Sequence, residues 1–388
     1  MHLPESDATQ AEPSARAAGH FKIVHTTKTS FARNGLVRTD HGEIETPAFM
    51  PVGTAGTVKG MSPEDLNELG AQIILSNAYH LYLRPGDDFI KKRKGLHSFI
   101  SWDKPILSDS GGYQIFSLTG LTRVTEEGVT FQSHIDGSQH FITPERAIEI
   151  ESNIGADIIM AFDECLPYPS DYEKTTLSLD RTLRWAKRCK EAHSREDQFL
   201  YGIIQGGFFG DLREKGVEGL LEMDFDGLAV GGLSVGEPQD KMLEVLERVV
   251  PIIPAHQPRY LMGVGRPEDL VEGVRRGIDL FDCVLPTRHA RTGALFTRHG
   301  EMHIKNARYK EDDQPLDPDC GCYTCRHFSR AYLRHLFIAK ELLAIRLNSL
   351  HNLYYYLGLL RGLRQAIRKD ALDNFCREFY GQRQSSRD

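Results

Sequence analysis

The sequence predicts a (β/α)₈ TIM barrel, preceded by short antiparallel strands and followed by a cysteine-bearing subdomain. Eight short apolar segments alternate with helical segments over roughly 240 residues, which is the pattern of a parallel α/β barrel. Polar residues stand at the C-terminal ends of these apolar segments. A doubly wound sheet is the alternative arrangement of the same units.

The elements follow in order along the chain. Residues 21–46 are expected to form short strands with turns at Asn34-Gly35 and His41-Gly42. A hairpin around Asp136-Gly137 is expected to interrupt the barrel. Ser62-Pro63 and Thr143-Pro144 each suit a helix start, because Ser and Thr cap helices and Pro is favoured in the first turn. The barrel strands are expected at 48–53, 73–80, 106–113, 157–165, 200–207, 227–233, 260–265 and 280–285, and further helices at 175–192, 212–223, 239–250 and 267–276.

Composition divides the chain into four parts. Residues 1–20, rich in Ala, Glu, Ser and Pro, are expected to be a disordered tail, and residues 21–300 the barrel. Residues 301–380 are expected to be a helical subdomain that packs on the barrel, and 381–388 a second tail. No apolar run approaches the ~20 residues of a membrane span, and no signal peptide is evident, so we expect a cytoplasmic protein without membrane contact.

Charge is unevenly distributed. The net charge is −7, yet residues 281–388 hold 18 Lys and Arg against 12 Asp and Glu, a net of +6, and the remainder carries −13. A basic C-terminal third on an acidic body suits a polyanion bound at one face. Chance variation of surface charge would account for the asymmetry equally well.

Asp282 interrupts the last apolar strand, and Pro286 and the basic residues Arg288 and Arg291 follow it in what we expect to be a loop. A carboxylate in such a strand is costly to bury unless something pairs with it. Other polar residues hold corresponding positions at strand ends: Asn77, Asp109, Asp163, Gln205 and Gly231-Gly232. In a barrel these ends share one face, where active sites lie.

Three of the seven cysteines, Cys320, Cys322 and Cys325, fall in a C-x-C-x₂-C pattern. This spacing indicates three thiolate ligands of a tetrahedral Zn²⁺ site. The fourth ligand is open among His327, His335, His351 and Cys376, and we favour His351, which is expected to open a helix after an Asn348-Ser349 cap. Four protein ligands leave no open position, so one structural zinc per chain and no organic cofactor are expected.

Five motifs together resemble those of tRNA-guanine transglycosylase of the bacterial type. They lie at 108–114, 161–165, 231–237, 260–265 and 281–288, and the likeness extends from about residue 21 to about 380. The resemblance implies exchange of the wobble guanine in tRNAs of the Asp, Asn, His and Tyr type for a 7-deazaguanine, a step in queuosine biosynthesis. The tRNA anticodon loop, guanine and the base preQ1 are the implied partners.

The resemblance also implies roles for individual residues. Asp282 would be the nucleophile of a covalent double displacement, and Asp109 the general acid and base, as in retaining glycosyl transfer. Asp163 would accept from N1–H and N2–H₂ of guanine, while Gln205 and the Gly232 N–H donate to O6 and N7. Further implied contacts to the base are Asp109, Tyr113, Cys165, Leu233, Val235 and Met262.

The incoming base and the RNA contacts follow from the same likeness. The Leu233 carbonyl, supported by Glu237, would bind the aminomethyl group of preQ1. Cys165 and Val235 match the preQ1-using pattern, and queuine use stays open as an alternative. Arg288 and Arg291 would hold the bases that flank the target. A homodimer formed near the zinc segment is also implied.

Two other functions compete. A non-catalytic RNA-binding homologue should lack the nucleophile or the acids of the base pocket, and Asp109, Asp163 and Asp282 are all present. A barrel hydrolase acting on a small nucleoside would leave the basic C-terminal segment unexplained.

Overall fold

The computed structural model describes residues 19–118 and 122–384. Residues 1–18 of the predicted N-terminal tail lie outside this range. His20, which we also assigned to that tail, is buried, with its Nε2 2.7 Å from the Tyr201 hydroxyl and its Nδ1 2.9 Å from the Arg38 carbonyl. The ordered fold therefore begins before residue 21.

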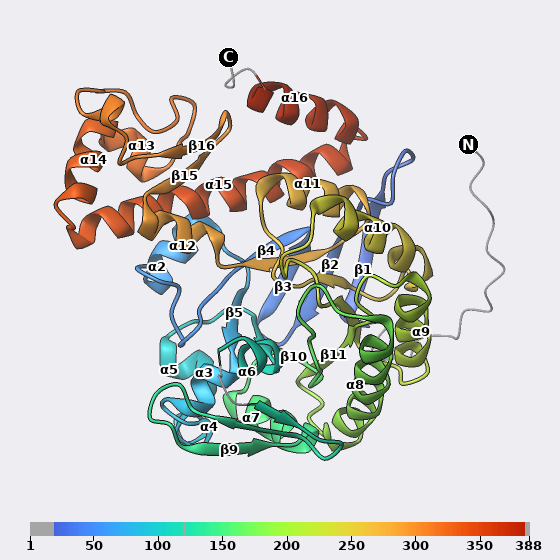
Figure 1. Ribbon diagram of the computed structural model, residues 1–388. Coiled ribbons are helices and arrows are strands. Elements are labelled where there is room, and N and C mark those ends of the chain that lie inside the picture. The colour runs from blue at the N-terminus through green and yellow to red at the C-terminus, as the bar shows by residue number, and fades with distance from the viewer. Residues whose placement is uncertain (1–18, 119–121, 385–388) are drawn as a thin grey trace.

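Eight parallel strands form the barrel (Figure 1). Their order in the sheet follows the sequence, and an isolated parallel bridge between Val52 and Leu75 joins the two edge strands, β4 and β5. This arrangement confirms the predicted barrel and excludes the doubly wound sheet. The strands are β4 (Ala48–Pro51), β5 (Ile74–Asn77), β6 (Ile106–Asp109), β10 (Ile158–Met160), β11 (Phe199–Ile204), β12 (Gly227–Val230), β13 (Arg259–Leu261) and β14 (Leu280–Cys283).

Helices alternate with these strands, and their start signals act as expected. Ser62 caps the first barrel helix: its side chain accepts from the Asp65 N–H, and Asp65 accepts from the Ser62 N–H in return. Thr143 caps another by accepting from the Arg146 N–H. The helices are α2 (Pro63–Leu69), α3 (Ala78–Leu83), α4 (Asp87–Lys91), α5 (Gly95–Ile100), α6 (Gly112–Leu118), α7 (Pro144–Ile154), α8 (Tyr172–Ala192), α9 (Gly210–Leu221), α10 (Gln239–Val249), η1 (Val250–Ile252) and α11 (Pro267–Arg275).

A three-stranded antiparallel sheet precedes the barrel, made of β1 (Phe21–Thr26), β2 (Arg33–Thr39) and β3 (Gly42–Thr46). The turn predicted at His41-Gly42 is present. The turn predicted at Asn34-Gly35 is wrong: both residues lie inside β2, where Gly35 lets the Phe21 ring approach to 2.6 Å from the position of a Cβ. Phe21, Val37 and Ile44 join the side chains of the barrel interior in one hydrophobic cluster, so this sheet covers the N-terminal end of the barrel.

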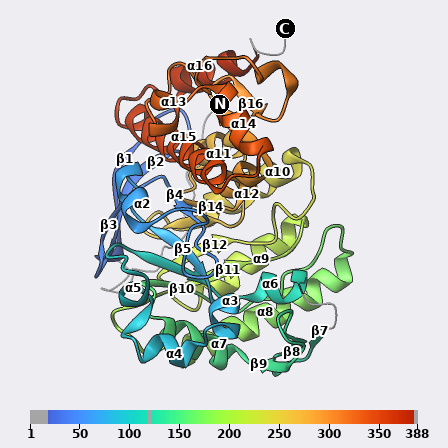
Figure 2. The same cartoon turned by 90° about the vertical axis from the view of Figure 1, so that its left-hand side faces the viewer.

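The predicted insertion is a three-stranded sheet rather than a single hairpin. It contains β7 (Thr122–Val124), β8 (Val129–Gln132) and β9 (Gln139–Ile142), with the turn at Asp136-Gly137 between the last two. Figures 1 and 2 place this sheet and the C-terminal helices at opposite ends of the molecule.

The C-terminal elements pack beside the barrel through one long helix. This helix, α15 (Leu342–Arg368), contacts α2, α11, α12 and β4 (Figure 1). The remaining elements are α12 (Leu285–Thr292), β15 (Ala294–Thr297), β16 (Gly300–His303), η2 (Ala307–Tyr309), α13 (Tyr323–His327), α14 (Arg330–Ile338) and α16 (Leu372–Gln384). The β15–β16 hairpin spans our boundary at residue 300, and α16 continues past the boundary at 380, so both boundaries need revision.

One local prediction in this region is wrong. The break between helices falls at Lys340, whose φ is +59°, and not at Asn348-Ser349. Both of those residues are fully buried inside α15, where the Asn348 side chain donates to the Ala290 carbonyl. They stay helical because tertiary contacts outweigh their preference for caps.

Among the described residues, no helix is both long and apolar enough to cross a bilayer.

Candidate active site

Asp282 lies in β14 near the C-terminal end of the strand and is 9% exposed. Its Oδ1 accepts two hydrogen bonds, each of 2.7 Å, from the Tyr260 hydroxyl and the Gly263 N–H. Among the described residues, Oδ2 accepts none. Burial raises the pKa of Asp282, and the two hydrogen bonds act against that rise. One oxygen is therefore held in place, and the other is free of hydrogen bonds from the described residues.

Asp109 ends β6 and is a second buried carboxylate beside the first. It accepts from the Asn77 and Gln114 side-chain amides and from the Ala78 N–H at 3.1 Å. Burial raises the pKa of Asp109 to about 7, and the nearby charge of Asp282 adds to the rise. A carboxyl group with a pKa near neutrality can both give and take a proton at physiological pH.

Asp163 and Gln205 form a polar pair at the ends of β10 and β11. The Gln205 Nε2 donates to Oδ2 of Asp163 at 2.7 Å, and both side chains are 5% exposed. Burial raises the pKa of Asp163 to about 6. An acceptor and an amide fixed in this way can read donors and acceptors on the edge of a planar base.

The loop after β12 completes this group. The φ of Gly232 is +65°, and a Cβ there would stand 2.5 Å from the Gln205 Oε1, so only glycine fits. Burial raises the pKa of the Cys165 thiol to about 12, and the nearby Gln205 amide and Gly232 N–H act against that rise, so the thiol stays protonated at neutral pH. A cavity of about 160 Å³ adjoins Gln205, Gly232 and Val235 and continues toward Phe208.

The other predicted base contacts surround the same strand ends. Tyr113, in the first turn of α6, is 52% exposed, and Met262, directly after β13, is half-buried. Leu233 is buried, with its side chain in the hydrophobic core. Glu237 accepts from the backbone N–H groups of Ser234 at 2.5 Å and Val235 at 2.9 Å, so it holds the loop that follows Gly232.

Arg288 and Arg291 are exposed and lie on α12, which starts two residues after β14 ends. The loop predicted here is wrong, because Pro286 occupies the first turn of a helix, where proline is favoured. Arg288 and Arg291 are three residues apart in the helix, so their side chains lie on one face of α12. The helix therefore presents two cations next to the strand that carries Asp282.

Several residues of the site carried no predicted role. Tyr260, Gly263 and Gln114 lie inside quoted motifs, and Asn77 was noted only as a polar strand end, yet all four contact Asp109 or Asp282. A polar residue near a strand end was the available signal for Asn77. No sequence signal told us that the Tyr260 side chain points to Asp282.

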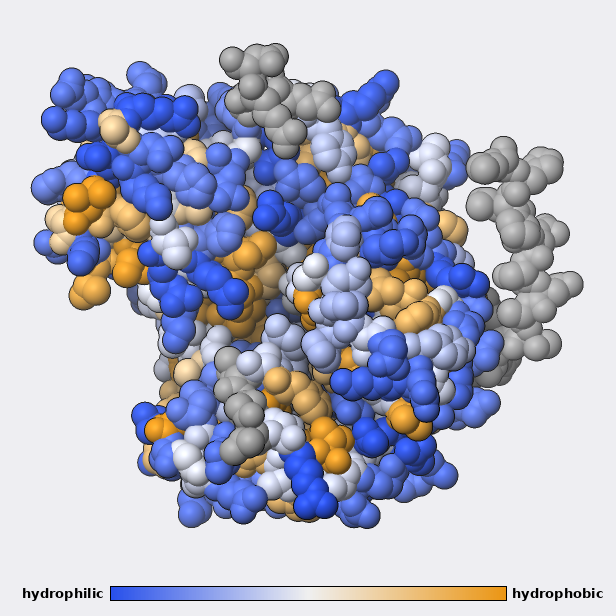
Figure 3. Space-filling view, in the orientation of Figure 1, coloured by the Kyte–Doolittle hydropathy of each residue, from blue (hydrophilic) through white to orange (hydrophobic). Residues whose placement is uncertain are grey.

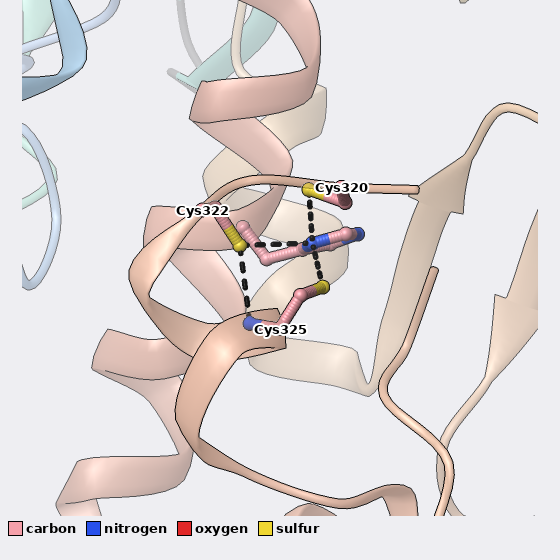
Figure 4. A group of neighbouring side chains, drawn as sticks. Cys320, Cys322 and Cys325 are labelled. Atoms are coloured by element: carbon pink, nitrogen blue, oxygen red, sulfur yellow. Dashed lines mark hydrogen bonds between the residues drawn. The ribbon is translucent and has the colours of Figure 1, made fainter. Parts of the chain in front are cut away.

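The metal site forms as predicted, with His351 as the fourth member (Figure 4). His351 Nδ1 lies 3.7, 3.5 and 3.3 Å from the sulfurs of Cys320, Cys322 and Cys325. Ligands of a tetrahedral zinc stand about 3.6 Å apart across an S–N pair, so the spacing suits one ion. His351 Nε2 donates to the Phe296 carbonyl at 2.8 Å, which leaves Nδ1 as the ligand atom.

One detail of that prediction is wrong. His351 lies in the middle of α15 rather than at a helix start. The other candidates, His327, His335 and Cys376, are not in the group of possible ligands.

Another His and Asp group lies at the opposite end of the barrel. His41 Nδ1 and His97 Nε2 bond to different oxygens of Asp157, at 2.7 and 3.1 Å. The two imidazole rings stack 3.6 Å apart at 9°. Because a metal lies close to the plane of each imidazole it binds, two parallel stacked rings cannot share one ion in this arrangement. The three side chains satisfy one another instead.

The fold and the site define a barrel enzyme whose strand ends bring together buried carboxylates and a polar pocket, and whose C-terminal part holds a Cys₃His group suited to a metal. Residues 27–385 match the family described as Queuine tRNA-ribosyltransferase. The chain belongs to this family and is a tRNA-guanine transglycosylase.

Curated relatives of that name agree over nearly the whole chain. The protein from Halothermothrix orenii is 59% identical over 92% of this chain and 96% of its own length. That from Lysinibacillus sphaericus is 57% identical over 93% of this chain and 95% of its own length. That from Caldanaerobacter subterraneus is 55% identical over 95% of this chain and all of its own length.

Proposed function

We propose that the enzyme exchanges guanine at the wobble position of tRNAs of the Asp, Asn, His and Tyr type for preQ1, in queuosine biosynthesis. The observation that carries this proposal is the pair of buried carboxylates at the C-terminal ends of β14 and β6, close enough for the charge of Asp282 to raise the pKa of Asp109. Asp282 has one oxygen free of hydrogen bonds from the described residues, and Asp109 has a pKa of about 7. That division suits a nucleophile and a proton carrier.

The reaction runs as a covalent double displacement. The free oxygen of Asp282 attacks the ribose C1′, the bond from C1′ to the guanine nitrogen breaks, and its electron pair stays on the base. Asp109, protonated, delivers a proton to the departing guanine. The incoming base then loses a proton to Asp109, attacks C1′ and releases Asp282. Asn77, Gln114 and the Ala78 N–H hold Asp109 for both proton transfers.

The base lies at the strand ends, between Tyr113 and Met262. Asp163 accepts from its N1–H and N2–H₂, and Gln205 and the Gly232 N–H donate to its acceptors, with Cys165 and Val235 beside it. The pairing of Asp163 with Gln205 supports this role, because both groups are fixed before the base arrives. The target base must leave the anticodon stack, which costs only a few kcal/mol in a single-stranded loop.

PreQ1 carries a cationic aminomethyl group, and the Leu233 carbonyl binds it. Glu237 supports this assignment, since it accepts from the two N–H groups that follow Leu233 and so fixes the peptide that presents the carbonyl. Arg288 and Arg291 hold the bases on either side of the target. Their shared face on α12 and their exposure support that role.

A structural Zn²⁺ occupies the Cys₃His site. Three thiols and an imidazole with its second nitrogen already bonded are the ligand set that zinc prefers. The residues supply four ligands, so the ion has no position for substrate and its role is to join α13 to α15.

The enzyme acts in the cytoplasm as a homodimer that uses the zinc segment. Exposed apolar side chains support this interface: Tyr323, Tyr332, Ile338, Leu342 and Leu343, of which Leu342 is 82% exposed. Figure 3 shows hydrophobic side chains gathered over α14 and the start of α15. Sedimentation equilibrium tests the assembly, and a monomer at all concentrations would contradict it.

The function itself is tested by a base-exchange assay. Unmodified tRNA that carries labelled guanine at the wobble position is incubated with the enzyme and with either preQ1 or queuine. We expect loss of label with preQ1 and little with queuine. Exchange with queuine alone would establish the queuine-using alternative, and no exchange with any base would favour a non-catalytic RNA-binding homologue.

A further inference from the structure

Arg213, on α9, is a fully buried guanidinium directly behind the strand ends that form the base pocket. It donates to three backbone carbonyls. Its Nε bonds to the Gly207 carbonyl at 2.7 Å, and its Nη1 bonds to those of Ile204 at 2.7 Å and Gly231 at 2.9 Å. These carbonyls belong to the ends of β11 and β12 and to the loop after β11.

No carboxylate among the described residues forms an ion pair with Arg213, and its Nη2 has no hydrogen-bond partner among them. Burial lowers the pKa of Arg213 to about 10, so the group remains charged at neutral pH. An unpaired buried cation is costly. Two other buried arginines show both arrangements: Arg33 on β2 pairs with Asp279 at 2.6 Å, whereas Arg259 on β13 bonds to the Gly277 and Ile253 carbonyls. What sets Arg213 apart is that all three of its carbonyl partners lie at the strand ends around the pocket.

The geometry of one peptide supplies that reason. The Gly231 carbonyl points at Arg213, and the peptide between Gly231 and Gly232 is trans. In a trans peptide the N–H points opposite to the carbonyl, so the Gly232 N–H is directed away from Arg213. The pocket groups lie around the same residue: a Cβ on Gly232 would stand 2.5 Å from the Gln205 Oε1, and the Gly232 N–H lowers the pKa of the Cys165 thiol against the effect of burial. The Gly231–Gly232 peptide dipole thus has its carbonyl end at the Arg213 cation and its N–H end on the opposite side, toward the base.

We infer that Arg213 is a positioning residue for base recognition, which fixes the Gly231–Gly232 peptide so that the Gly232 N–H addresses the exocyclic oxygen of the base. The inference rests on the proposed function. When the glycosidic bond breaks, the electron pair left on the base spreads partly onto that oxygen. A donor already aimed at this atom, backed by a charge in a low-dielectric site, favours the departing base.

The test compares guanine with 6-thioguanine, which keeps the N–H groups that face Asp163 but presents a weakly accepting sulfur. Affinities of both free bases are measured by calorimetry for the wild type and for Arg213→Met. We expect the variant to lose about tenfold in guanine affinity and much less for 6-thioguanine, because only guanine uses a strong contact to the N–H. The preference for guanine should shrink accordingly.

A merely structural role would weaken both bases alike and leave their ratio unchanged, which would overturn the inference. Arg181→Met is the matched control, since Arg181 is partly buried on the neighbouring helix α8 and pairs with Glu164 at 2.5 Å. In Arg181→Met the ratio of guanine affinity to 6-thioguanine affinity should equal that of the wild type. If Arg213→Met does not fold, as judged by thermal melting, Arg213→Gln removes the charge while keeping one donor and gives the same readout.

Failure of the proposed function would look different. A wild-type enzyme that binds guanine but never exchanges it into tRNA would contradict the proposed reaction. The affinity ratio would still decide the role of Arg213.

Discussion

The Tyr260 hydroxyl and the Gly263 N–H bond to the same oxygen of Asp282, each at 2.7 Å. Two adjacent barrel strands therefore cooperate, since Tyr260 is on β13 and Asp282 on β14. The pair orients one carboxylate oxygen and spares the other for chemistry.

Replacement of Asp282 by Asn should abolish the covalent complex between enzyme and tRNA, because an amide oxygen is a poor nucleophile. Denaturing gel electrophoresis after incubation with tRNA measures the complex. Asp163→Asn is the control, since it alters base recognition and keeps the nucleophile, so some complex should persist. A normal yield of complex with Asp282→Asn would refute the assignment of the nucleophile.

Replacement of Tyr260 by Phe should slow formation of the complex by about 10- to 100-fold, since one hydrogen bond to a charged group is worth about 1.5–3 kcal/mol. The lost hydroxyl also lowers the pKa of Asp282 in the wild type. The acidic limb of the rate profile should therefore move to higher pH in the variant. Tyr201→Phe, which loses a hydroxyl bonded to His20 at the other end of the barrel, should leave that limb in place.

Formation of the complex should slow as pH rises through about 7. The folded pKa of Asp109 lies near that value, raised chiefly by burial. In the proposed reaction, guanine departs with the proton of Asp109. Above pH 7 the protonated fraction falls, by about tenfold per pH unit once the group is mostly ionised. Single-turnover rates between pH 5.5 and 9 measure this limb, and a rate that rose steadily up to pH 9 would contradict the role of Asp109.

Replacement of His351 by Ala should release the metal and lower the melting temperature. Three thiols remain in the variant, but the ligand from α15 and its bond to Phe296 are lost. Metal analysis should give about one zinc per chain in the wild type and close to none in the variant. Cys376→Ser, a buried cysteine outside the group, should keep the metal. Full zinc content in His351→Ala would show that another residue completes the site.

Replacement of Arg288 by Ala should weaken tRNA binding by about 1–3 kcal/mol, because the side chain is proposed to hold a base that flanks the target. A contact to a base rather than to a phosphate should leave the slope of log affinity against log salt nearly unchanged. Lys187→Ala is the control, because Lys187 is exposed on α8. Equal affinity of the Arg288 variant and the wild type for tRNA would remove this residue from the RNA surface.

The barrel was predictable because its periodicity is strong and local: apolar segments alternate with helical ones, several of them end in a polar residue, and Ser62 and Thr143 mark helix starts. The break in the C-terminal helices was not predictable. Asn348 and Ser349 look like a cap in sequence, but burial against α12 keeps them helical. Local preference of about 1 kcal/mol is easily outweighed by tertiary contacts.

The residues of the site were also predictable only in part. Asp282, Asp109 and Asp163 follow from their places at the C-terminal ends of strands. Asp157 and Asp279 are also aspartates close to strands, yet they lie at the N-terminal ends and form structural pairs with His41 and Arg33. Arg213 gave no signal at all, because an arginine in a polar helix resembles any solvated one.

The barrel closes by pairing of its last strand with its first, and this limits when the enzyme can become active. β14, which carries Asp282, pairs with β4 from the opposite end of the barrel sequence. A ribosome must therefore release more than 280 residues before Asp282 has both of its flanking strands. Until then β4 is an open edge, and any N-terminal fragment that ends before β14 lacks both a closed barrel and Asp282.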